Sequence, residues 1–176
     1  MVEVLVHLIL PVIVLLAFRP KIDKVLVFSL AVLAVMPDLD IIIGHRTLFH
    51  NVFFAIGMSL LVAFVVGLVS AKKQQAFYLS VYFLFSHMFL DLGNPGVPFF
   101  YPLSSRLFTV NFSVLISPFR EGFLGSGLSI DSAVITNPII EAVKPQVMPV
   151  VTTFGVLLLV LVLLLFIIRF INCKGY

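Results

Sequence analysis

Three short stretches of the sequence carry histidine or aspartate, the side chains that most often bind divalent metal ions. The first, Asp38-Leu39-Asp40, follows Pro37. Proline disfavours helix in the residue before it, so a helix is predicted to end here. Two carboxylates beside a helix C-terminus add to its partial negative charge, which favours a bound cation. In an extended Asp-x-Asp both side chains project to one face, and the alternative is a solvated turn.

The second stretch runs from Gly44 to His50 and contains His45. Two histidines five residues apart lie about 140° apart around an ideal helix, so they converge only if one precedes the helix. Gly44 permits such a junction between a loop and a helix. The alternative is a pair of histidines at the membrane interface. Arg46, between them, would stabilise anionic charge or contact lipid phosphates.

The third stretch places His87 and Asp91 four residues apart, on one face of a helix, where both can hold one metal ion. Ionisable residues within a membrane span are functional by default, because burying them unpaired is costly. The alternative is a hydrogen-bonded pair that packs helices. His7 is interpreted either as a further ligand or as an interfacial histidine with a satisfied hydrogen bond.

Imidazole and carboxylate ligands without a thiolate suit zinc, with manganese and iron as alternatives. A catalytic zinc ion uses about three protein ligands and a water, so a larger set of candidates also allows two ions. The predicted metal ligands are His7, Asp38, Asp40, His45, His50, His87 and Asp91.

Membrane helices must position these residues. The chain has 176 residues, 61% hydrophobic and 11% charged, whereas soluble domains are about 45–50% apolar and about 25% charged. We therefore expect one membrane-embedded all-α domain over residues 1–176, with about five transmembrane helices. The Lys and Arg residues form no basic stripe, which argues against nucleic-acid binding. The expected helices cover about residues 2–18, 22–36, 51–70, 76–92 and 147–168.

Lys and Arg also predict the orientation of the chain. They concentrate in the short loops on one side of the membrane, which the positive-inside rule makes cytoplasmic. The N-terminus is then outside, the C-terminus is cytoplasmic, and all four histidines fall toward the outer side. Glu3, in place of a basic segment, predicts that no signal peptide is cleaved. We expect one polar site at the non-cytoplasmic face of the cell membrane.

Residues 93–146 form a long connection that is too apolar for disorder, so we expect a partly ordered lid on the outer face. Partial alternation over Thr109–Ser117 is a weak strand signal. Ser132–Val143 is predicted as a short surface helix capped by Asp131.

The sequence resembles the membrane-bound metal-dependent hydrolases, also described as YdjM-like or LexA-binding inner-membrane-associated hydrolases. The resemblance covers roughly residues 1–110 and implies a multi-helix membrane protein with hydrolase activity. Thr47 follows the His-Arg pair where the family often has glycine, and Phe49-His50-Asn51 replaces its Thr-His-Ser. The spacing of His87 and Asp91 also looks like part of the zinc-dependent phospholipase C pattern. The matching stretches are Pro37-Asp38-Leu39-Asp40, Gly44-His45-Arg46 with His50, Ser86-His87 with Leu90-Asp91, Gly96-Val97-Pro98, Tyr101-Pro102-Leu103 with Arg106, and the early His7.

These patterns predict a metal-dependent hydrolase that acts at the outer membrane face on a phosphoester of a lipid or lipid-linked substrate. Whichever of Asp38 and Asp40 is not a ligand would be the general base. Arg46, with Arg106 second, would stabilise developing negative charge. Two other classes stay open: a metal ion transporter, with ionisable groups along a path across the bilayer, and a non-catalytic metal-binding membrane protein whose lid binds a partner. The oligomeric state is not predicted.

Overall fold

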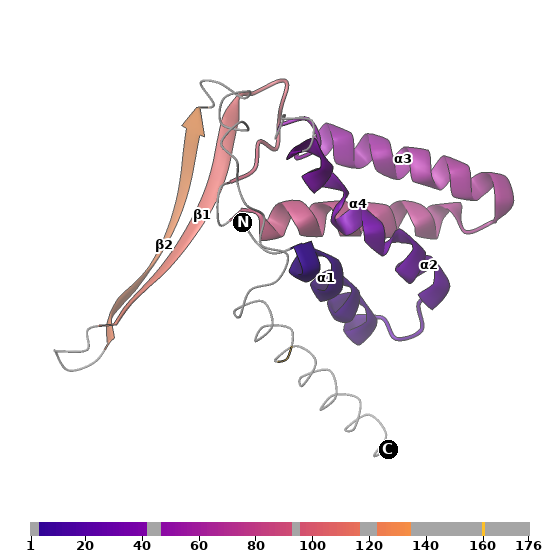
Figure 1. The fold of residues 1–176 in the computed structure, drawn as a ribbon, viewed down its shortest axis with the longest axis horizontal. Coiled ribbons are helices and arrows are strands. Elements are labelled where there is room, and N and C mark those ends of the chain that lie inside the picture. Colours follow the sequence, from indigo (N-terminus) through magenta and orange to yellow (C-terminus); the bar gives the residue numbers. More distant parts are fainter. Residues whose placement is uncertain (1–3, 42–46, 93–95, 117–122, 135–159, 161–176) are drawn as a thin grey trace, which may run out of the picture.

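A computed structural model describes residues 4–41, 47–92, 96–116, 123–134 and 160 of the chain. Helices lie side by side, and a β-hairpin extends away from them (Figure 1). The all-α prediction therefore holds for the helical bundle and is wrong for the predicted lid, where two strands form. The elements in chain order are α1 (Val4–Phe18), α2 (Lys24–Leu30), the 3-10 helices η1 (Ala31–Ala34) and η2 (Met36–Ile41), α3 (Val52–Val69), α4 (Lys73–Leu90), β1 (Arg106–Ile116) and β2 (Phe123–Val134).

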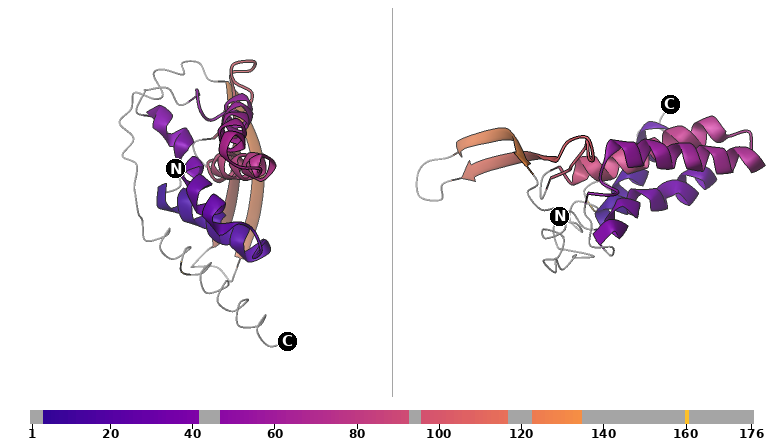
Figure 2. Two further views of the ribbon diagram at one scale, coloured as in Figure 1. Left: turned by 90° about the vertical axis from the view of Figure 1, so that its right-hand side faces the viewer. Right: turned by 90° about the horizontal axis from the view of Figure 1, so that it is seen from above.

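Helix α4 is the centre of the bundle. It lies between α3 on one side and α1 and α2 on the other (Figures 1 and 2). Phe83 and Leu84 of α4 are fully buried, and Met88 is 1% exposed. Because α4 contacts every other helical element of the bundle, its last turn is well placed to organise a site with residues from several of them. The buried core comprises Val12, Val27, Ala31, Leu33, Ala34, Ala55, Leu79, Phe83, Leu84, Met88 and Val97.

Helix α3 has the character of a lipid-facing membrane span. It has 18 residues and a mean hydropathy of 2.7, and only 11% of it is buried inside the protein. Large apolar side chains such as Phe64 and Leu68 are 65% and 70% exposed. Within the described residues α3 is the one helix long and apolar enough to cross a membrane, so five spanning helices are not confirmed. The predicted span 147–168 lies outside the described residues.

The segment predicted as a helix over residues 22–36 is a chain of shorter helical pieces. After α2 the backbone tightens into η1 and η2, and Pro37 lies inside η2 rather than ending the helix. Proline fits the first turn of a helix because its missing N–H would have no partner there. Asp38 N donates to Val35 O at 3.2 Å, an i to i−3 bond of the 3-10 type. The Asp-x-Asp segment is therefore helical, and the expected extended geometry is wrong.

The polar residue before α3 fixes where this helix begins. Asn51 Oδ1 accepts a hydrogen bond from Phe54 N at 2.8 Å, which caps the helix. The Asn51 amide also donates to the carbonyls of Thr47 and Leu48, at 3.1 and 2.7 Å. A single buried side chain thus holds both the first turn of α3 and the loop before it, and His50 lies directly between them.

Replacing Asn51 with alanine is expected to destabilise the protein by about 1–2 kcal/mol, because the capping bond is lost and the two loop carbonyls lose their donor. Thermal unfolding of the detergent-solubilised protein measures this change. Asn51→Asp is the informative companion: it keeps the cap but not the amide donors, so its stability should lie between those of the wild type and Asn51→Ala. Equal stability of all three proteins would contradict the role of Asn51.

The β-hairpin occupies much of the predicted lid. β1 and β2 pair antiparallel from Arg106↔Val134 to Ile116↔Phe123, with an irregularity between Leu115 and Ile116. The strand signal over Thr109–Ser117 is confirmed as far as residue 116. The predicted helix over Ser132–Val143 is wrong at residues 132–134, which belong to β2. Cross-strand pairing overrides local helix signals such as the capping Asp131. Residues 135–143 lie outside the described residues.

The segment between α4 and β1 joins the hairpin to the bundle. Val97 is fully buried and bridges Phe108, with N–H···O distances of 2.9 and 3.0 Å. Val52 N, at the start of α3, donates to Phe99 O at 2.9 Å. Gly96 N donates to Asp91 O at 3.3 Å. This segment therefore fixes the ends of α3 and α4 against each other.

Candidate metal centre

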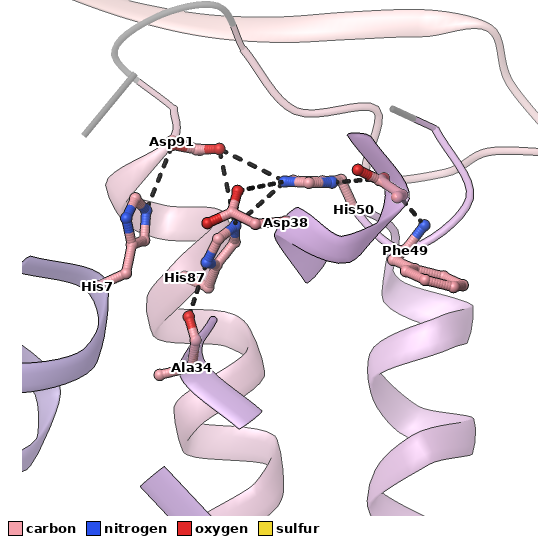
Figure 3. Close-up of polar contacts among 8 residues, drawn as sticks. His7, Ala34, Asp38, Phe49, His50, His87 and Asp91 are labelled. Carbon is pink, nitrogen blue, oxygen red and sulfur yellow. Dashed lines mark hydrogen bonds and ion pairs between the residues drawn. The ribbon is translucent and has the colours of Figure 1, made fainter. Parts of the chain in front are cut away.

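Four side chains converge where η2 and the start of α3 meet the end of α4 (Figure 3). Asp38 lies in η2, His50 immediately precedes the N-cap of α3, His87 is in the last turn of α4, and Asp91 is the C-cap of α4. One nitrogen or oxygen atom of each residue lies within 4.8 Å of those of the others. We refer to Asp38, His50, His87 and Asp91 as the four-donor cluster.

The spacing within the four-donor cluster fits a four-coordinate ion. The Nε2 atoms of His50 and His87 are 3.1 Å apart. Asp91 Oδ2 lies 3.5 and 3.7 Å from these two nitrogens, and Asp38 Oδ1 lies 4.0 and 3.5 Å from them. Zinc binds nitrogen and oxygen at about 2.0–2.1 Å, which separates tetrahedral ligand atoms by roughly 3.3–3.4 Å. The chemistry of the donors, two imidazoles and two carboxylates, also suits zinc, manganese or iron.

A hydrogen bond to a backbone carbonyl orients the His87 imidazole toward the cluster. His87 Nδ1 donates to Ala34 O at 2.7 Å, which leaves Nε2 as the free ligand atom (Figure 3). The Ala34 carbonyl is available because both of its usual helical donors are missing. Pro37 has no N–H, and Asp38 N donates to Val35 O instead. The tight turn around the proline therefore creates the acceptor that orients a histidine of another helix.

The Asp40 carboxylate orients the His50 imidazole in the same way. His50 Nδ1 lies 2.8 Å from Asp40 Oδ2, which also accepts from Phe49 N at 3.4 Å. Asp40 is fully buried on the far side of the imidazole from the four-donor cluster. Residues two apart differ by about 240° around a 3-10 helix, which explains why Asp38 reaches the cluster and Asp40 does not. Asp40, a predicted ligand, is placed to orient His50 instead.

The surroundings of His50 favour positive charge. Burial lowers the pKa of this imidazole, but hydrogen bonds with Asp40 and Asp91 outweigh burial and raise the pKa to about 9. In addition, the two Nε2 atoms lie 3.1 Å apart. If neither is protonated, their lone pairs face and repel each other, and a cation between them would relieve this repulsion. A metal ion would supply this positive charge in place of a proton.

His7 lies at the edge of the four-donor cluster. Its Nε2 is 3.3 Å from Asp91 Oδ1, and its ring centroid is 4.2 Å from that of His87 (Figure 3). Asp91 therefore contacts the cluster with one oxygen and His7 with the other. This position lets His7 orient Asp91, and it equally agrees with a role as ligand to a second ion.

The four donors differ slightly in exposure among the described residues. The Asp38 side chain is 10% exposed, whereas His50 and His87 are fully buried and Asp91 is 1% exposed. Asp38 is therefore the donor nearest to solvent.

The structure describes one of the three remaining predicted site residues, Arg106. His45 and Arg46 fall outside the described residues. Arg106 is exposed at the start of β1, and among the described residues it forms no ion pair with the four-donor cluster. The role of the Ala34 carbonyl could not be predicted from side-chain motifs, because they do not reveal a backbone acceptor. The position of Pro37, three residues later, is the signal that could have indicated it.

Replacing Asp40 with asparagine is expected to weaken zinc binding about 10- to 100-fold, because the amide accepts a weaker hydrogen bond from His50 and no longer raises its basicity. Competition against a chromogenic chelator measures the affinity. Asp23→Asn is the matched control: Asp23 caps α2 far from the cluster, and asparagine caps equally well. Equal affinities of the two variants would show that His50 needs no carboxylate behind it.

The fold and the cluster define a class of protein: a helical membrane protein with a buried histidine–aspartate group that could hold a metal ion. The sequence model of the family described as YdjM inner membrane protein matches residues 1–173. The chain belongs to this family, which confirms the resemblance seen in the sequence and supports a location in the inner membrane. No curated protein and no solved structure matches the chain, and the likeness to zinc-dependent phospholipase C gains no support.

Proposed function

We propose that the protein is a membrane-bound hydrolase that uses a divalent ion, zinc as first choice, held by the four-donor cluster. The cluster itself carries this proposal. Its two imidazoles are each oriented by a hydrogen bond at Nδ1, to Ala34 O and to Asp40. Collecting buried carboxylates and imidazoles inside an apolar bundle is costly unless an ion compensates for it.

The described residues have distinct roles in this proposal. A bound ion would supply Lewis acidity and, with a fifth position taken by water beside the four donors, would lower the pKa of that water to about 7. Asp38, the donor nearest to solvent, is the candidate general base, because a carboxylate that offers one oxygen to an ion can hold a proton on the other. Asp40 holds His50, and its place behind the imidazole argues against a role as base. Arg46 and Arg106 remain the proposed groups for stabilising developing negative charge.

We propose a phosphoester of a lipid or lipid-linked molecule as the substrate. The support is the position of the cluster at one end of an apolar bundle, with Asp38 as its least buried donor and the buried Val97 segment beside it. With the N-terminus outside, as the Lys and Arg distribution predicts, this end faces the non-cytoplasmic side of the membrane.

A non-catalytic role is the second candidate, and one observation favours it. Three of the four donors are at most 1% exposed, and structural metal sites are closed whereas catalytic sites keep an open position. Transport has less support from the described residues. Their ionisable groups within the bundle gather at its two ends, and α3 carries none between Val52 and Val69, whereas transporters place such groups near mid-bilayer.

Metal analysis combined with a hydrolysis screen tests the proposal. We expect purified protein to retain about one zinc ion per chain and to cleave at least one phosphoester lipid. A chelator should abolish this cleavage, and added zinc should restore it. Bound zinc without cleavage of any lipid in the screen would favour the non-catalytic role. Uptake of zinc into proteoliposomes would favour transport.

A further inference from the structure

A cavity lies between α1 and α4, at the opposite end of the bundle from the four-donor cluster. Its volume is about 810 Å³, within the range of about 300–1,000 Å³ typical of small-molecule sites. Apolar side chains such as Leu15, Ile22 and Leu79 line it, and two cations, Arg19 and Lys21, lie at its rim. An apolar cavity with a cationic rim is chemically matched to an anionic amphiphile.

The two cations at the rim have no acidic partner in the part of the chain that the structure describes. Arg19 and Lys21 are both exposed. The acidic residue closest to them in sequence, Asp23, is already paired with Lys72. Two unpaired positive charges beside each other attract an anion, and phosphate is the anion that a membrane surface supplies.

Aromatic side chains indicate the depth of the rim. Phe18 and Tyr78 line the cavity and are 69% and 61% exposed. An exposed tyrosine such as Tyr78 beside Lys and Arg is typical of the membrane–water interface. The rim therefore lies at the level of lipid headgroups, and the apolar part of the cavity lies at the level of the acyl chains.

A second apolar space lies further along the seam between α1 and α4. Tyr82 lines both this cavity and an adjoining groove of about 520 Å³, whose other walls include Val14 and Phe85. The Tyr82 hydroxyl donates to Pro11 O at 2.9 Å, so the polar atom of this shared wall is already satisfied. An acyl chain that occupies both apolar spaces would therefore lie across the Tyr82 ring.

We propose that this cavity binds one anionic phospholipid, with its phosphate at Arg19 and Lys21 and an acyl chain along the seam between α1 and α4. The site is separate from the four-donor cluster. The proposal does not depend on the hydrolase activity, and the lipid acts here as a bound partner rather than as a substrate.

Native mass spectrometry of the full-length protein in neutral detergent tests the proposal with defined probes. We expect one molecule of dioleoyl phosphatidylglycerol to bind, with dioleoyl phosphatidylcholine binding at least about tenfold more weakly. The double variant Arg19→Gln/Lys21→Gln should weaken binding of the anionic lipid about tenfold or more. The matched control is Lys24→Gln/Lys73→Gln, which removes the same charge from exposed lysines at the same end of the bundle but outside the cavity, and it should bind like the wild type.

Two further probes test whether the acyl chains contribute to binding or the phosphate alone accounts for it. Dihexanoyl phosphatidylglycerol should bind more weakly than the dioleoyl lipid, because it leaves the seam unfilled, and inorganic phosphate should not displace the dioleoyl lipid. Equal weakening in both double variants would overturn the proposal in favour of general surface charge. Equal binding of the phosphatidylcholine, or displacement by inorganic phosphate, would overturn it as well.

Discussion

Replacing His87 with alanine is expected to remove bound metal from the purified protein. His87 Nε2 lies 3.1 Å from His50 Nε2 and within 3.7 Å of the facing oxygens of Asp38 and Asp91, so the variant loses the most central donor. Losing a residue that only orients a ligand costs about 10- to 100-fold in affinity, so losing the ligand should cost at least about 100-fold. Metal content per chain after dialysis, together with isothermal titration with zinc, measures the loss.

Two companion variants make this result interpretable. His87 is fully buried, so alanine also leaves a cavity, and His87→Gln restores most of the volume without the imidazole. Ser86→Ala is the matched control on the same helix, because the Ser86 hydroxyl donates only within its own turn, to Phe83 O. A folded His87→Ala protein with the zinc content of Ser86→Ala would mean that the ion, if any, is bound elsewhere.

Replacing Gly96 with alanine is expected to destabilise the protein by at least about 2 kcal/mol. Gly96 has a φ of 93°, a left-handed conformation that costs other residues about 1–3 kcal/mol. A Cβ atom there would also lie 2.8 Å from Phe108 O and collide with the Thr109 side chain. Thermal unfolding in detergent should show a clearly lower midpoint. Zinc affinity should fall too, since Gly96 N donates to the carbonyl of Asp91.

Gly57→Ala provides the comparison for this prediction. Gly57 lies inside α3, and a Cβ atom added there meets no atom within 4 Å. Alanine has the higher helix propensity, by about 1 kcal/mol, so this variant should be as stable as the wild type or more stable. If Gly96→Ala unfolds at the same temperature as Gly57→Ala, the segment between α4 and β1 does not constrain the bundle.

The helices could be predicted from the sequence where the chain forms a long apolar run. Long apolar runs located α1, α3 and α4 to within a few residues of their observed bounds. Apolar character does not distinguish an α-helix from a 3-10 helix, so the break after Leu30 was missed. The hairpin was predicted only in part, because most residues of β1 pair with residues more than ten positions further along the chain, which leave no local signal.

The candidate site was predictable where its residues share one helix. His87 and Asp91 follow from their i, i+4 spacing alone. Asp38 and Asp40 could not be told apart, because their roles depend on the 3-10 turn that sends one toward the four-donor cluster and the other behind His50. Which element packs against α4 is decided by tertiary contacts, and no motif encodes it.

The two facing histidines of the four-donor cluster lie far apart in the sequence. His50 and His87 are 37 positions apart, and α3 and almost all of α4 lie between them. The site is therefore absent until both helices have formed and packed against each other. An ion bound by both imidazoles would close this long loop and stabilise the packing of α3 against α4. Metal binding would therefore be a late step in the assembly of the protein.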